Sequence, residues 1–333
     1  MSRLFTTVSA ITLFTGSAAL ADSPRVVADI APVHSLVSRV MDGIGKPDLI
    51  VPNETSPHDY RLRPADAEAL ENAGLVFWMG EGLTPWMERA LESLSGEATI
   101  VELLALDETK TLPFREGALF DAHDHSEHDD HDDHDDHDHD KEHDDHDDHD
   151  DHGHDDHAGH DHGEFDPHAW LSTDNAKTWL NVIAAKLSSI DPTNAGGYFA
   201  NASEAIVELD ALDKEVDEML DTVRGGKFIV FHDAYQYFET VYDFPASGAI
   251  SLGDASDPGA ARIAEIAKRI ESENIQCVLS EPQFNANMVD TVMAGTEAKT
   301  EVIDPLGFGI EPGSSLYTKL IKGMATSLVN CLK

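Results

Sequence analysis

The sequence predicts an α/β fold with two lobes and one long helix between them. Short apolar runs alternate with helical patterns along the chain, which is the order expected of parallel sheets covered on both faces by helices. One helical pattern of about 30 residues, far longer than the others, separates two sets of these runs. The chain therefore divides into residues 22–191, a linking helix at 192–224, and residues 225–333.

The first 21 residues are expected to be an export signal. Arg3 precedes an apolar run, and Ala19-Leu20-Ala21 has the small-x-small pattern that signal peptidase recognises. No later stretch approaches the roughly 18 uninterrupted apolar residues that a membrane-spanning helix needs. We expect an exported protein that is cleaved near Ala21.

The first lobe, residues 22–191, contains four apolar runs that indicate buried strands: "RVVADI", "PDLIVP", "LVFWMG" and "ATIVELL". Helical patterns such as "PADAEALENAG" and "TPWMERALESL" lie between them. A low-complexity insertion at 119–164 follows. The lobe ends with "STDNAKTWLNVIAAKLSSI", where capping residues precede an amphipathic pattern.

The linking helix and the second lobe complete the pattern. Apolar residues recur at helical spacing over 192–224, and a helix of that length would extend roughly 45 Å. The predicted strands of the second lobe are "KFIVFHD", "ASGAI", "IQCVLSE" and "TEVIDPL". Its predicted helices span residues 258–271, 284–297 and 315–330.

The net charge of −42 is concentrated in the insertion. Residues 121–163 hold 15 of the 19 histidines, 21 acidic residues and one lysine, so they contribute −20 and leave −22 for the rest. This acidic charge argues against nucleic acids and anionic lipids as partners, since binding to both requires clustered Lys and Arg. With no apolar residues to bury, the insertion cannot form a core, and we expect a disordered loop.

Cys277 and Cys331 are the two cysteines of the chain. In an exported protein they meet an oxidising compartment, which favours a structural disulfide over a metal or redox role. Closing a loop of this size stabilises by roughly 4 kcal/mol in the chain-entropy model. The disulfide would clamp the C-terminal helix.

Four histidines lie outside the insertion, and three of them have settings that suggest metal binding. His232 stands at the carboxyl end of a predicted strand, His58 lies in a loop directly after another strand, and His168 just precedes a helix. Asp304 also follows a strand. Three imidazoles and one carboxylate would suit a tetrahedral Zn²⁺ site. Each residue taken alone is more often a surface or capping residue.

Five stretches carry a more specific signal because they occur together and in order: "SPHDYRLRPADA", "DPHAWLS", "FHDAYQYFE", "EPQF" and "IDPLG". They resemble the zinc-specific periplasmic substrate-binding proteins of ABC transporters, the ZnuA family, over essentially the whole mature chain. The resemblance implies two Rossmann-like lobes with parallel sheets joined by one long rigid helix, and a metal site in the cleft between them. The two cysteines also match a disulfide found in such proteins.

The same resemblance implies a role and a ligand set. The protein would be a monomer in the periplasm that captures Zn²⁺ and docks on the permease of a permease–ATPase complex. The family's histidine ligands fall on His58, His168 and His232. Some relatives have an acidic residue before the first of these, where this chain has Pro57. The fourth ligand is therefore Asp304 or water. Independently of the resemblance, Glu281 ends a predicted strand, where we expect it to make a hydrogen bond that supports the site or positions the lobes.

Several alternatives remain open at this point. Sibling families that carry manganese or iron typically have a carboxylate in place of His232, and three imidazoles shift the preference toward Zn²⁺. Affinity order alone also admits Cu²⁺ or Ni²⁺. A free-standing periplasmic zinc buffer would need the insertion and no permease. Three histidines and water on Zn²⁺ also describe a hydratase or hydrolase, but no separate general-base motif such as H-E-x-x-H is present.

The insertion would bind further zinc ions loosely, each through two or three histidines together with Asp and water. Ordering a flexible chain costs entropy, so these sites should be weaker than a preformed one. The insertion would suit capture, buffering or transfer to the cleft; the alternative is an insertion that is dispensable when zinc is plentiful. The histidines predicted to serve as accessory ligands are His128, His131, His134, His137, His143, His146, His149 and His152.

Overall fold

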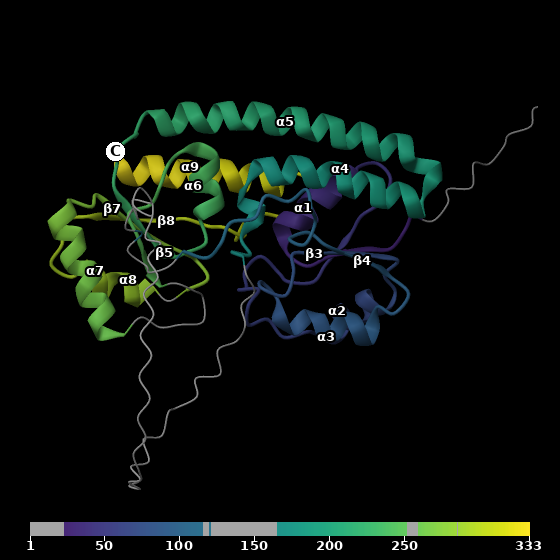
Figure 1. The fold of residues 1–333 in the computed structure, drawn as a ribbon, viewed down its shortest axis with the longest axis horizontal. Helices are drawn as coiled ribbons and strands as arrows, with labels where there is room; N and C mark the ends of the chain where they lie inside the picture. Colours follow the sequence, from purple (N-terminus) through teal and green to yellow (C-terminus); the bar gives the residue numbers. More distant parts are fainter. Residues whose placement is uncertain (1–22, 116–119, 121–164, 252–258, 285) are drawn as a thin grey trace, which may run out of the picture.

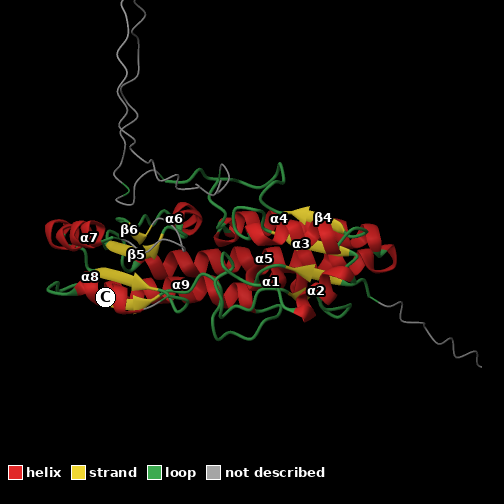
Figure 2. Ribbon diagram, turned by 90° about the horizontal axis from the view of Figure 1, so that it is seen from below, coloured by secondary structure: helices red, strands yellow, loops and turns green. Residues whose placement is uncertain are grey.

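Two parallel four-stranded sheets lie toward opposite ends of the long axis of the molecule (Figures 1 and 2). The structure is a computed structural model, and it describes residues 23–115, 120, 165–251, 259–284 and 286–333. The predicted export signal and the predicted accessory histidines lie outside these residues. We call the part of the fold around each sheet a lobe.

The first sheet has the strand order β2-β1-β3-β4, and every pairing is parallel. Its central strands β1 and β3 are wholly buried, which explains why they read as continuous apolar runs. Helices α2 and α3 lie together on one side of this sheet (Figure 1). The elements are β1 (Val26–Ala28), α1 (Ala31–Val40), β2 (Asp48–Leu49), α2 (Pro64–Glu71), β3 (Leu75–Trp78), α3 (Pro85–Leu94) and β4 (Thr99–Glu102).

The second sheet repeats this order as β6-β5-β7-β8, again with parallel pairing throughout. The eight apolar runs of the sequence thus correspond to the eight strands found in the described residues, and the predicted α/β class is confirmed. In such sheets, ligands bind beyond the carboxyl ends of the strands. The elements are β5 (Phe228–His232), α6 (Gln236–Tyr242), β6 (Ala249–Ser251), α7 (Ala260–Glu273), β7 (Cys277–Ser280), α8 (Ala286–Met293) and β8 (Lys299–Val302).

A layer of helices runs along both lobes (Figure 1). The long helix α5 (Ala195–Asp221) lies over α4 (Thr173–Ile190) near the first sheet and over α9 (Leu316–Leu332) near the second. The predicted long helix is therefore present, but its first turn is a separate 3₁₀ turn at Pro192–Asn194. Proline at the first position of that turn suits the fixed backbone angle of this residue.

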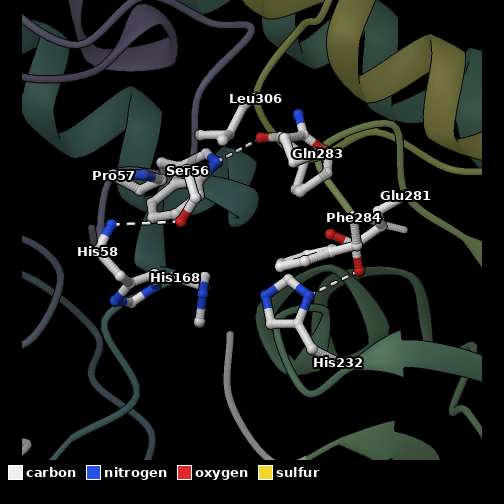
Figure 3. A pocket seen from close by; sticks show the side chains of 11 residues that line it. Ser56, Pro57, His58, His168, His232, Glu281, Gln283, Phe284 and Leu306 are labelled. Atoms are coloured by element: carbon white, nitrogen blue, oxygen red, sulfur yellow. Dashed lines mark hydrogen bonds and ion pairs between the residues drawn. The ribbon is translucent and has the colours of Figure 1, made fainter. Parts of the chain in front are cut away.

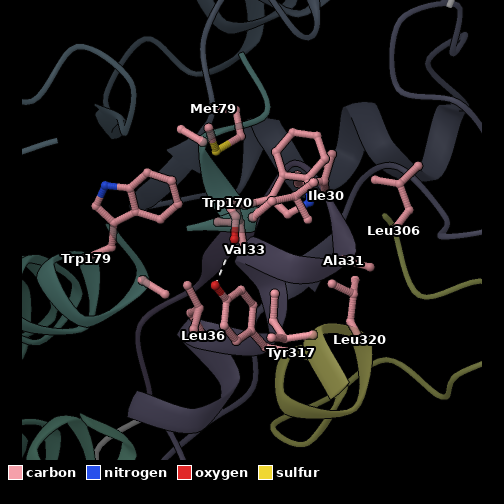
Figure 4. Packing of buried hydrophobic residues seen from close by; sticks show 14 of the residues in the cluster. Ile30, Ala31, Val33, Leu36, Met79, Trp170, Trp179, Leu306, Tyr317 and Leu320 are labelled. Atoms are coloured by element: carbon pink, nitrogen blue, oxygen red, sulfur yellow. Dashed lines mark hydrogen bonds between the residues drawn. The ribbon is translucent and has the colours of Figure 1, made fainter. Parts of the chain in front are cut away.

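The lobes are joined by more than α5, because α9 packs back against the first lobe. The backbone amide of Tyr317 donates to Ser35 Oγ at 2.9 Å, and the Tyr317 hydroxyl donates to the carbonyl of Trp170 at 2.8 Å (Figure 4). Both aromatic side chains are almost completely buried in a hydrophobic cluster that contains residues of both lobes. The lobes consequently share a core along this helical layer.

The predicted disulfide is present between Cys277, the first residue of β7, and Cys331 near the end of α9. Their Cα atoms are 5.6 Å apart. The bond connects α9 to the amino-terminal end of β7, opposite the carboxyl ends of the strands in the second sheet. Among the helices that the structure describes, none combines the length and apolar character needed to cross a bilayer.

Candidate metal site

His58 lies in the loop that connects β2 to α2, and its neighbours fix this loop. The indole nitrogen of Trp86 donates to the carbonyl of Pro57 at 2.8 Å, and the backbone amide of His58 lies 3.4 Å from Ser56 Oγ. Tyr60 donates its hydroxyl to Asp66 at 2.6 Å. These contacts hold the backbone on both sides of the imidazole.

His168 directly precedes a 3₁₀ turn (Ala169–Leu171) that leads into α4. One oxygen of Asp166 accepts from the backbone amide of His168 at 2.9 Å and lies 2.7 Å from its Nδ1 atom. The imidazole is largely buried. Because Nδ1 is engaged by Asp166, Nε2 is the nitrogen left to bind a metal.

His232 is the last residue of β5 and is also buried. Its Nδ1 atom lies 2.6 Å from Oε1 of Glu281, which follows the last residue of β7 (Figure 3). The expected supporting hydrogen bond of Glu281 is therefore present. His168 and His232 share one arrangement, in which a carboxylate holds Nδ1 and leaves Nε2 for a ligand.

Two segments of the first lobe and the end of β5 in the second bring the three imidazoles together around one small pocket (Figure 3). The ring centroids of His168 and His232 are 5.3 Å apart, and those of His58 and His168 are 5.9 Å apart. The pocket has space for about one water-sized group. Its lining is Ser56, Pro57, His58, His168, Trp170, His232, Glu281, Gln283, Phe284, Pro305 and Leu306.

These separations can be compared with those of a tetrahedral site. With Zn–N distances of about 2.0 to 2.1 Å, two imidazoles on one ion have centroids roughly 5.2 Å apart. The pair His168 and His232 matches this value, and the pair His58 and His168 is wider by less than about 1 Å. Within the described parts of the chain, no three His, Cys, Asp or Glu side chains are already close enough to form a ligand set. The centroid separations of these two pairs are therefore close to those expected around one tetrahedral Zn²⁺ ion.

Asp304 lies two residues beyond β8 and is not among the residues that line the pocket. Its Oδ1 atom accepts from the backbone amide of Leu306 and from the side-chain amide of Gln283, both at 3.0 Å. Asp304 therefore holds two residues that do line the pocket.

Sequence reasoning missed two polar groups beside the imidazoles. Asp166 could have been found, because an Asp side chain commonly accepts from the backbone amide two residues further along the chain, here that of His168. Arg115 could not, because its partners Asp233 and Glu239 are more than 100 residues away in the sequence. Burial raises the pKa of both carboxyls, and the Arg115 guanidinium between them opposes this rise.

Comparison with known proteins shows the family of the chain. Residues 26–331 match the family model "Zinc-uptake complex component A periplasmic", ZnuA. The chain belongs to the ZnuA family. The high-affinity zinc uptake system protein ZnuA of Brucella abortus (strain 2308) is 44% identical over 332 residues, covering 100% of this chain and 98% of the relative.

Solved structures show the same fold at low sequence identity. A zinc-bound deletion mutant of ZnuA has a TM-score of 0.69 at 21% identity, with 94% of this chain and 99% of that chain covered. The Pseudomonas aeruginosa binding protein FpvC in complex with Mn²⁺ has a TM-score of 0.72 at 18% identity, with coverages of 93% and 98%.

Proposed function

We propose that this ZnuA family protein binds one Zn²⁺ ion tightly between its lobes, as cargo, and delivers it to an ABC permease and its ATPase. The single observation that carries this proposal is the convergence of His58, His168 and His232 on one pocket, the first two from the first lobe and the third from the end of β5 in the second. Three imidazole nitrogens favour Zn²⁺ over Mn²⁺ or Fe²⁺, which prefer more carboxylate oxygens. A ligand set divided between lobes also lets the bound ion alter their relative position, which a permease can recognise.

The remaining features suit uptake in the periplasm. We place the export signal at 1–21, the first lobe at 22–191, the linking helix at 192–224 and the second lobe at 225–333. The mature protein acts as a monomer, and either Asp304 or water completes the coordination. The histidine-rich insertion binds additional ions weakly and supplies or stores zinc beside the tight site. We assign no catalytic activity to the bound ion.

A metal titration of three proteins tests the tight site: the mature wild type, a variant lacking residues 116–164, and His232→Ala. A chelator of known affinity competes for the metal, so that the tight site is measured apart from weak ones. One tight Zn²⁺ site should survive the deletion, and His232→Ala should weaken it more than 100-fold. Several weak sites should disappear with the insertion.

Two results would overturn the proposal. If deletion of residues 116–164 abolished tight binding, the site would lie in the insertion. If Mn²⁺ or Fe²⁺ competed with Zn²⁺ at equal concentration, the protein would be a manganese or iron carrier. Zinc-dependent transport after reconstitution with the permease separates delivery from a free-standing buffer, which would bind the ion and transfer none.

A further inference from the structure

Arg115 connects the two lobes next to the candidate metal site. Its Nε atom donates to both carboxylate oxygens of Asp233, at 2.9 and 3.0 Å. Its Nη1 and Nη2 atoms donate to the two oxygens of Glu239 in α6, at 2.7 and 3.1 Å. The Arg115 side chain is 17% exposed, and the two carboxylates are 7% and 6% exposed. A planar guanidinium that pairs with two buried carboxylates has little freedom to move.

In the second lobe, the pairing of Arg115 with Asp233 lies directly beside His232, a candidate ligand. Asp233 follows His232, and the backbone turns sharply there, because the amide of Ala234 donates to the carbonyl of His232 at 3.0 Å. Glu239 is anchored in turn, since its Oε2 atom accepts from the amide of Ala246 at 3.2 Å. Arg115 is thereby coupled to the position of the His232 backbone.

On the first-lobe side, the segment that carries Arg115 is joined to the segment that carries His168. Pro113 and Phe165 form an antiparallel bridge, and the amide of Asp166 donates to the carbonyl of Leu112 at 2.9 Å. The hydroxyl of Tyr237 in α6 donates to the carbonyl of Asp166 at 2.8 Å and accepts from the amide of Leu112 at 3.0 Å. Residues 112–115 and 165–168 are thus held as one unit against α6.

We propose that Arg115 is a positioning residue for zinc capture, which sets the separation of His168 and His232 through its contacts with Asp233 and Glu239. The inference rests on the proposed function of this pocket. The two imidazoles come from different lobes, and their separation of 5.3 Å is close to the value that one tetrahedral ion requires. The hydrogen bonds of Arg115 go to Asp233 and Glu239, so it acts on the two rings through the segments that hold them.

If Arg115 acted only through its charge, its loss would change zinc affinity in the opposite direction from a loss of positioning. Arg115 carries one positive charge close to a site for a dication, so its loss without any movement should strengthen zinc binding. Loss of positioning should instead weaken it, since displacement of one ligand costs a metal–nitrogen bond. The sign of the change therefore separates the two roles.

The test compares Arg115→Met, Arg115→Lys and Arg39→Met in the full mature chain. Arg39 is a matched control, because it is 14% exposed and pairs with two carboxylates, Glu204 and Glu208 of α5, at the far end of α1. Zinc affinity is measured by chelator competition and zinc dissociation by stopped flow. The absorption spectrum of the Co²⁺-substituted protein reports coordination geometry.

We expect Arg115→Met to lower zinc affinity at least tenfold, mainly through faster dissociation, and to change the Co²⁺ spectrum. Arg115→Lys keeps the charge but loses the planar fork, so it should show a smaller loss in the same direction. Arg39→Met should bind zinc as the wild type does. If Arg115→Met does not fold, Arg115→Lys decides the question, because a pure charge role predicts no change for that variant.

Unchanged or tighter zinc binding in the folded Arg115 variants would overturn the inference, as would an equal loss in Arg39→Met. These outcomes are distinct from failure of the proposed function. In that case the wild type itself would lack a tight zinc site, and His232→Ala would change nothing.

Discussion

Glu281 Oε1 lies 2.6 Å from Nδ1 of His232, and both side chains are buried. The residues are 49 positions apart and come from the ends of the neighbouring strands β5 and β7. This pairing determines which nitrogen of the imidazole is available to a metal. A carboxylate in this position also increases the basicity of the ligand.

We therefore expect Glu281→Gln to weaken zinc binding by about 10- to 100-fold, the usual range for loss of such a partner. Glutamine can still accept a hydrogen bond but carries no charge to stabilise the metal-bound imidazole. Chelator competition measures the effect. Glu297→Gln is the control, because it removes the same charge from an exposed position in the same lobe, near the opposite edge of the sheet. Equal affinity in the two variants would show that Glu281 has no role in binding.

Asp304→Asn tests the fourth ligand. The asparagine oxygen can continue to accept from Leu306 and Gln283, so the loop should keep its shape. Because Asp304 does not line the pocket, we expect water to complete the coordination and zinc affinity to fall less than tenfold. A loss above 100-fold, comparable to that of His232→Ala, would identify the Asp304 carboxylate as a ligand.

Much of the fold could be predicted because buried parallel strands are unbroken apolar runs. The run before His232, for example, is a central strand whose residues are all buried. The short helix α6 was not predicted, since its seven residues are too few to show a helical period. Its placement depends on packing and on polar contacts such as that of Tyr237 with Asp166.

The candidate site could be predicted only in part, because its supporting contacts also depend on how distant segments pack together. Histidines in order along the chain indicate possible ligands, and the family resemblance selected His58, His168 and His232. Their partners belong to other segments: Glu281 reaches His232 through the pairing of β5 with β7, and Arg115 reaches Asp233 across the lobes. Such contacts are decided by tertiary structure and leave no local pattern.

Loss of the disulfide should destabilise the protein and leave the metal site intact. Cys277→Ala together with Cys331→Ala releases a link between residues 54 positions apart, which costs roughly 4 kcal/mol of unfolding free energy in the chain-entropy model. Cys277 begins β7, whereas the pocket lies beyond its other end. Urea unfolding of the zinc-free protein gives the stability change. A loss of zinc affinity greater than tenfold in the folded variant would contradict this separation.

Asp29 should make stability depend on pH. It follows β1, is completely buried, and accepts from the backbone amides of Ile30 and Met79, each at 2.8 Å. Burial raises the pKa of this carboxyl from 3.8 to about 7, although the two amides oppose the rise. Between these values the folded state keeps a proton that the unfolded state has lost. The contribution of Asp29 to stability therefore falls as the pH rises from about 4 to 7, and is constant above 7.

Urea unfolding of the wild type and Asp29→Asn at several pH values measures this contribution. Asparagine does not titrate, so the unfolding free energy of the wild type relative to the variant should fall by roughly 4 kcal/mol over this interval, at about 1.4 kcal/mol per pH unit. Both proteins share all other titrating groups, whose effects cancel in the difference. A difference that stays flat from pH 4 to 7 would mean that the two amide donors keep Asp29 ionised despite its burial.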